Sequence, residues 1–125
     1  MHLLIYLLLT QSLSVSAPWI PAPAADATTA IVHLVVENPT MYDVYVMSAT
    51  SDAAEAVELR ESDGHGGTRP ASSLTASAYG SLEMTEAGPH LRLTNLTRPI
   101  KAGDTVAIVL ATDGGERLTV AAIVK

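Results

Sequence analysis

The stretch Thr-Ala-Ile-Val-His-Leu-Val-Val-Glu, residues 29 to 37, is the strongest indicator of the fold. Most of its residues are β-branched or aliphatic, and such side chains pack well on the pleated surface of a sheet. The stretch ends at Asn38-Pro39, a dipeptide that is typical of a turn. These features predict a strand that stops at the end of this stretch.

Similar strand signals flank this stretch on both sides. Thr105 to Thr112 and Glu116 to Val124 are joined by Asp113-Gly114-Gly115, which indicates a hairpin. Ala54 to Glu61 alternates between apolar and polar residues, although its Ala, Glu and Leu residues also suit a helix. Further strand patterns cover residues 13–20, 44–49, 74–78, 81–85 and 90–95. Seven or more short strands predict an all-β protein, a β-sandwich or barrel with Greek-key connections.

The composition excludes several classes of function. The chain has 125 residues, which suits one domain, and 48% of them are hydrophobic, which is enough for a core. Its net charge of −6 and the lack of a Lys/Arg run argue against nucleic acid as a partner. With no cysteine, it has no disulfide and no thiol chemistry. Because no Gly-x-Ser-x-Gly motif and no phosphate loop occur, we expect a monomeric binding or structural module with no substrate, not an enzyme.

The first residues resemble an export signal. The apolar run from Leu3 to Leu9 is too short to span a bilayer, which needs ~20 residues, and resembles the central region of a signal peptide. No Lys or Arg precedes it, which suggests a truncated start; a buried strand or helix is the alternative. We expect residues 1–11 to be signal-like and residues 12–125 to form the β domain. Ala22-Pro23-Ala24 offers a later cleavage site. The protein is then secreted by a signal peptide and lies in the periplasm or another extracytoplasmic space.

Histidine and methionine are the residues most suited to a ligand site. Imidazole and thioether groups are donors that Cu(I) selects. His65 lies in a glycine-rich turn, His90 begins an alternating segment, and Met84 precedes it by six residues. His33 lies in the middle of a predicted strand, where a histidine on a sheet face is the ordinary expectation.

Four segments of the chain match the pattern of one known family in order and spacing. They are Val15 to Ala22, Ala30 to Pro39, Ala54 to Glu61 and Leu96 to Val106. The last, Leu-Thr-Arg-Pro-Ile-Lys-Ala-Gly-Asp-Thr-Val, is similar to Leu-x-Arg-Pro-Leu-Lys-x-Gly-Asp-x-Val in periplasmic copper chaperones of the PCu(A)C family. This resemblance implies a cupredoxin-like fold. It also implies Cu(I) delivery to the CuA centre of cytochrome c oxidase, with the assembly proteins of that enzyme as partners.

The copper motif of that family, H-x10-M-x21-H-x-M, is mostly replaced in this chain. Its first His falls on Arg60, and its Met falls on Thr68 if the intervening turn is three residues shorter. The second His is His90, and the final Met falls on Arg92. Arginine offers no lone pair to a metal. A unit charge ~7 Å from Cu(I) opposes binding by about 2.4 kcal/mol at an effective dielectric of ~20.

Two hypotheses follow from this replacement. In the first, the protein is copper chaperone-like and still binds Cu(I), with His65, His90 and Met84 as metal ligands. In the second, it keeps the fold and has lost the metal, so it is an exported interaction domain. The two arginines would then pair with carboxylates such as Glu58 or Glu83, or attract an anion.

Overall fold

Ten β-strands build residues 12–125, the part of the chain that the computed structural model describes. The predicted all-β class is confirmed, and the segment that also suited a helix is a strand, β4. No helix long and apolar enough to cross a membrane occurs within residues 12–125. The predicted signal segment, residues 1–11, lies outside the described residues. The strands are β1 (Ser14–Ile20), β2 (Thr29–Glu37), β3 (Val44–Ser51), β4 (Ala54–Ser62), β5 (Thr68–Pro70), β6 (Leu74–Ala76), β7 (Ser81–Met84), β8 (His90–Leu96), β9 (Thr105–Thr112) and β10 (Arg117–Val124).

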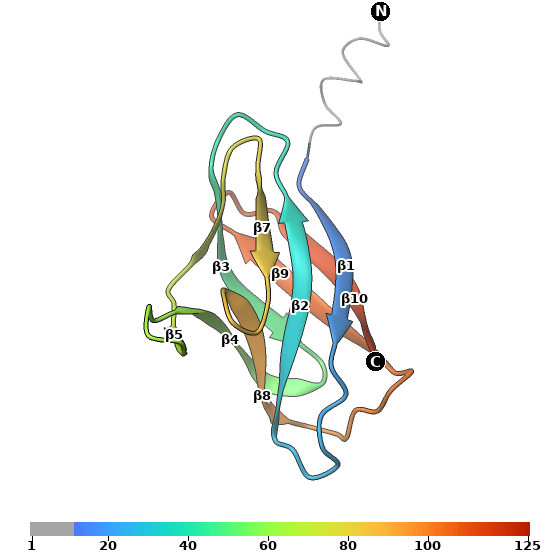
Figure 1. Cartoon of the computed structure of the whole chain (residues 1–125). Coiled ribbons are helices and arrows are strands. Elements are labelled where there is room, and N and C mark those ends of the chain that lie inside the picture. Colours follow the sequence, from blue (N-terminus) through green and yellow to red (C-terminus); the bar gives the residue numbers. More distant parts are fainter. Residues whose placement is uncertain (1–11) are drawn as a thin grey trace, which may run out of the picture.

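The strands form one curled sheet with a non-sequential order. Along the sheet the order is β5-β4-β8-β2-β1-β10-β9-β3-β6, and β7 pairs with β2 off this path. Neighbours that are distant in the sequence, such as β8 with β2 and β9 with β3, are the crossovers that a Greek-key arrangement requires. The sheet curls so that β2, β8 and β4 face β9 and β10 across the core (Figure 1).

Strand β2 changes its partner halfway along its length. Residues 29 to 32 pair with β8, whereas residues 34 to 37 pair with β7. His33 lies between the two ladders, at the point where β7 and β8 diverge. On its other edge β2 pairs with β1, where a bulge between Ser16 and Trp19 shifts the register. A bulge redirects side chains locally, so β2 is irregular on both of its edges near His33.

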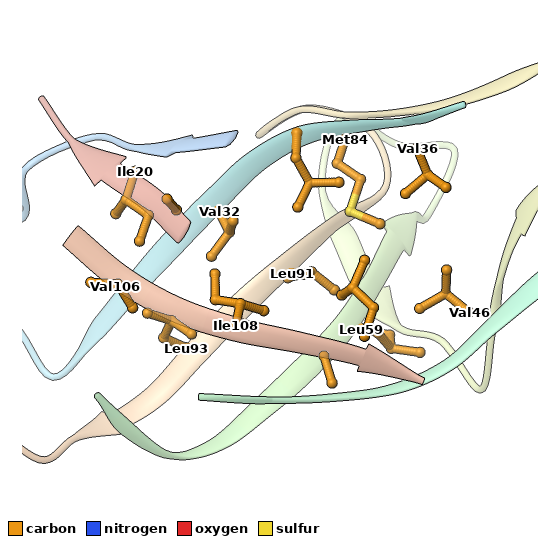
Figure 2. Packing of buried hydrophobic residues seen from close by; sticks show 14 of the residues in the cluster. Ile20, Val32, Val36, Val46, Leu59, Met84, Leu91, Leu93, Val106 and Ile108 are labelled. Atoms are coloured by element: carbon orange, nitrogen blue, oxygen red, sulfur yellow. The ribbon is translucent and has the colours of Figure 1, made fainter. Parts of the chain in front are cut away.

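The core is aliphatic because the chain has no Phe. Alternate residues of each strand point inward, and Figure 2 shows Ile108 of β9 among side chains from β2 and β8. Burial of each such side chain stabilises the fold by about 1.5–3 kcal/mol. The largest fully buried side chains are Ile20, Leu34, Met84, Leu91, Leu93, Ile108, Leu110, Val32, Val36, Val46, Val106 and Val124.

One buried polar residue, Asn38, closes the turn that the Asn-Pro dipeptide predicts. Its side-chain nitrogen donates hydrogen bonds to the carbonyls of Tyr42 (2.8 Å) and Ala76 (2.9 Å). Its side-chain oxygen accepts from the backbone N–H and the hydroxyl of Thr40. Because Asn38 is only 1% exposed, these bonds satisfy groups that water does not reach.

Candidate functional site

The residues at the copper-motif positions lie on the outer face of β4, β5 and β8. In the ladder between β4 and β8, Arg60 is opposite His90 and Glu58 is opposite Arg92. Leu91, between the two β8 residues, is fully buried in the core. Since successive side chains of a strand point to opposite faces, the four other side chains share the outer face. The fold therefore brings three of the four motif positions together on adjacent strands.

Glu58 joins the two arginines of the motif into one network, here named the arginine cluster (Glu58, Arg60, Thr68 and Arg92). The carboxylate oxygen Oε1 of Glu58 accepts from Arg60 at 3.0 Å and from Arg92 at 2.7 Å. Arg60 also donates to the carbonyl of Thr68 at 2.8 Å and to its hydroxyl. Of the two carboxylates predicted as arginine partners, Glu58 is the one that pairs. The fourth motif position, Thr68, is thus in direct contact with the first.

His90 lies under the loop that connects β7 to β8. It is 3% exposed, and its Nδ1 is 3.1 Å from the carbonyl oxygens of both Thr85 and Gly88. Two carbonyl acceptors require a hydrogen on Nδ1, so the neutral ring has its lone pair on Nε2. Backbone carbonyls that fix a histidine tautomer in this way are a common feature of metal-ligating histidines.

His33, which the sequence indicated only as a sheet-face residue, lies next to this histidine. The β2–β8 ladder ends at the pair Val32 and Leu91, and His33 and His90 are the residues that follow this last pair on the two strands. The Nε2 atom of His33 is buried and has no hydrogen-bond partner. Burial lowers the pKa of His33, while the charge of Glu86 raises it and that of His90 lowers it further. Both groups therefore lie close enough to act on the His33 ring.

The lone tryptophan packs on the other side of His33. Trp19 of β1 is opposite His33, and the two rings stack with centroids 4.6 Å apart and an interplanar angle of 29°. The amino group of Lys125 lies 5.6 Å from the Trp19 ring centroid, in a cation–π position. Trp19 is half-buried at the edge of this outer face.

A small cavity of about 170 Å³ borders His33. It lies between β1 and β7 over β2, and Thr85, whose carbonyl holds His90, is one of its wall residues. Its lining combines aromatic, carboxylate and thioether residues: Ala17, Trp19, His33, Leu34, Val35, Glu83, Met84 and Thr85. Glu83, the other carboxylate predicted to pair with the arginines, lies here.

The other two predicted ligands lie in different surroundings. His65 is exposed in the β4–β5 turn, where its N–H and that of Gly67 donate to Asp63 and lower the pKa of that carboxyl. Met84 is 2% exposed and points into the core, as Figure 2 shows. Among residues 12–125, no group of three or more His, Asp or Glu residues is arranged to hold a metal ion.

Comparisons with known proteins agree with this architecture. A family model described as "Putative lipoprotein LpqE-like" matches residues 13–124. A curated protein of Leifsonia xyli subsp. xyli, "Putative lipoprotein Lxx21020", is 28% identical over 119 residues, which cover 92% of this chain and 70% of the relative.

Solved structures of copper-binding domains share the fold. The copper-bound PCuAC domain from PmoF2 superposes with a TM-score of 0.79 at 17% identity, over 90% of this chain and 92% of that one. The solution structure of CuI-DR1885 from Deinococcus radiodurans gives a TM-score of 0.73 at 26% identity, over 92% and 77% of the two chains. The resemblance to the PCu(A)C family and the cupredoxin-like fold predicted from the sequence are confirmed.

Proposed function

Because this chain belongs to the LpqE-like lipoprotein family and has the fold of PCuAC copper-binding domains, we propose that it is a copper chaperone-like protein acting outside the cytoplasm. It reaches that compartment through the signal-like segment at residues 1–11. The names of its relatives as lipoproteins support this location. The finer role that we propose is Cu(I) transfer toward the CuA site of cytochrome c oxidase, with assembly proteins of that enzyme as partners.

The geometry of His90 is the observation that carries this proposal. It is the one motif ligand that the chain retains, and two backbone carbonyls hold its ring with Nε2 as the free donor. A buried histidine that is fixed in this tautomer has little further conformational freedom to lose when it binds a metal. His65 and Met84 remain proposed additional ligands.

A second candidate function is a metal-free interaction domain, and the arginine cluster favours it. Arg60 and Arg92 occupy two ligand positions of the motif and already share the carboxylate of Glu58. Neither side chain can donate a lone pair to copper. In this case the outer face of β4 and β8 binds a partner protein or an anionic ligand.

A Cu(I) titration under anaerobic conditions distinguishes the two candidates. We expect the full chain to bind Cu(I) in competition with a chromophoric chelator, and His90→Ala to abolish that binding. A Met41→Ala variant, at a methionine that is 61% exposed and is not among the proposed ligands, serves as the control for the loss of a single soft donor. If the full chain shows no detectable binding, the copper function is wrong and the metal-free domain is the correct description.

A further inference from the structure

We propose that His33 and His90 form a two-histidine site for divalent copper, one strand away from the motif position of the family. This inference rests on the proposed copper function and names a ligand and an oxidation state that the motif does not contain. The two residues are named the histidine pair below.

The first argument is the sheet register. The motif site lies on the β4 side of His90, where Arg60 is its direct neighbour. On the β2 side, the next position of the register is His33. Residues directly opposite on antiparallel strands have Cβ atoms about 4.5–5.5 Å apart, a spacing that two imidazole rings can bridge through one metal ion.

The second argument is the state of the ring nitrogens. Nδ1 of His90 is committed to two carbonyls, which leaves Nε2 as its donor atom. Nε2 of His33 is buried without a hydrogen-bond partner. An unsatisfied buried polar atom costs free energy, and a cation bound to its lone pair removes that cost.

The third argument is charge. On the β4 side of His90, the guanidinium of Arg60 is half of an ion pair whose partner, Glu58, is shared with Arg92. On the β2 side, the carboxylate residue Glu83 lines the same cavity as His33, and the charge of Glu86 raises the pKa of His33. A cation therefore meets net positive charge at the old position and a carboxylate at the new one.

The fourth argument is the kind of donor. Met84, which lines the cavity beside His33, belongs to the buried core, so the pair itself supplies only nitrogen. Imidazole donors suit divalent copper, which heads the affinity order of divalent first-row metals, whereas thioethers select Cu(I). No third His, Asp or Glu within residues 12–125 completes the site, so solvent or a partner protein fills its open positions. An ion held by only two protein ligands is readily transferred to a partner that supplies further ligands.

The stacking of Trp19 on His33 provides a direct optical readout. Since the rings are 4.6 Å apart and the chain has one Trp, an ion on His33 quenches the only indole fluorescence of the protein. The test titrates CuSO4 into the full chain carrying His2→Ala, which removes the histidine next to the N-terminus. We expect quenching that saturates at one equivalent, and electron paramagnetic resonance with nitrogen couplings from two imidazoles.

Three variants in the same background identify the ligands. His33→Phe keeps an aromatic ring against Trp19, and His90→Gln keeps a polar side chain under the loop; each should weaken Cu(II) binding by at least about tenfold. His65→Ala tests whether the β4–β5 turn supplies the ligand instead, and Met41→Ala, at an exposed methionine, is the control that should leave binding unchanged. Circular dichroism and urea unfolding check that each variant folds, and His33→Asn replaces His33→Phe if it does not.

The outcomes separate this inference from the proposed function. Unchanged Cu(II) affinity in His33→Phe overturns the histidine pair, and Cu(I) binding that still requires His90 would leave the proposed function standing. Copper binding that is lost in His65→Ala also overturns the pair, because it assigns the ligand to the turn. If neither Cu(I) nor Cu(II) binds the full chain, both proposals are wrong.

Discussion

Replacing Glu58 by glutamine should destabilise the protein by about 2 kcal/mol, because both arginines of the cluster depend on one carboxylate oxygen. Glutamine keeps the size and shape of the side chain and removes its charge. Glu58 Oε1 accepts from Arg60 at 3.0 Å and from Arg92 at 2.7 Å. The neutral amide oxygen can replace these charge-assisted bonds only in part.

The magnitude follows from distance and exposure. Unit charges ~4 Å apart attract by about 4 kcal/mol at an effective dielectric of ~20. Solvent reduces this value, since Glu58 and Arg92 are each 35% exposed, and the two guanidinium groups also repel each other. Arg60 is only 11% exposed, so losing its partner leaves a largely buried charge. Hydrogen bonds to charged groups contribute about 1.5–3 kcal/mol net, which gives the expected value of about 2 kcal/mol.

Urea unfolding followed by circular dichroism measures the change, with Glu61→Gln as the matched control. Glu61 pairs with Arg69 at 2.9 Å on neighbouring strands, but Arg69 is 63% exposed. An exposed pair of this kind contributes under about 1 kcal/mol. If Glu58→Gln lowers the free energy of unfolding by no more than Glu61→Gln does, the reasoning is refuted, because burial of Arg60 would then have no energetic consequence.

Three other predictions concern the motif, the β2–β3 turn and the buried imidazole. The combined change Arg60→His, Thr68→Met and Arg92→Met should raise Cu(I) affinity by at least about 50-fold, since it removes two positive charges and even one of them, at ~7 Å, is worth about 2.4 kcal/mol. Chelator competition measures the affinity, and no gain would show that these positions are not the motif. Asn38→Ala should cost about 2–3 kcal/mol in urea unfolding, because the buried carbonyl of Ala76 and the partly buried carbonyl of Tyr42 lose their donor; a cost under ~0.5 kcal/mol would contradict this. Folding lowers the pKa of His33 below 6.5, so the unfolded chain binds the proton more readily than the folded chain. The contribution of His33 to the free energy of unfolding is therefore complete above pH 6.5 and declines as the pH falls through the lowered pKa. The loss of stability between pH 7.5 and pH 5.5 should therefore be smaller in His33→Phe than in the parent, and equal losses would argue against a lowered pKa of His33.

Local patterns in the sequence predicted most strands correctly. The hairpin of β9 and β10 followed from Asp113-Gly114-Gly115, and β2 followed from its β-branched run. The strand Thr68–Pro70 was missed, because three residues that include a proline contain too short an alternation to recognise. It forms because it pairs with β4 over the turn that carries His65.

The sequence predicted the motif positions of the candidate site but not the histidine beside them. Alignment with a known motif located Arg60, Thr68, His90 and Arg92, and the arginines were expected to pair with a carboxylate. His33 gave no signal of its own, since a single histidine in a strand is usually an ordinary sheet-face residue. The alternation of β2 places His33 on the outer face. Only the pairing of β2 with β8 shows that the second motif histidine lies beside it on that face.

The sequence by itself determined the β class and which side chains of each strand face the core. Alternation has a period of two because of backbone geometry within one strand, so it can be recognised without knowing the neighbours. Only the tertiary structure decided that β8 lies between β4 and β2, and hence that His90 has Arg60 on one side and His33 on the other. Pairing between strands distant in the chain depends on how the whole aliphatic core closes, and no local pattern specifies that.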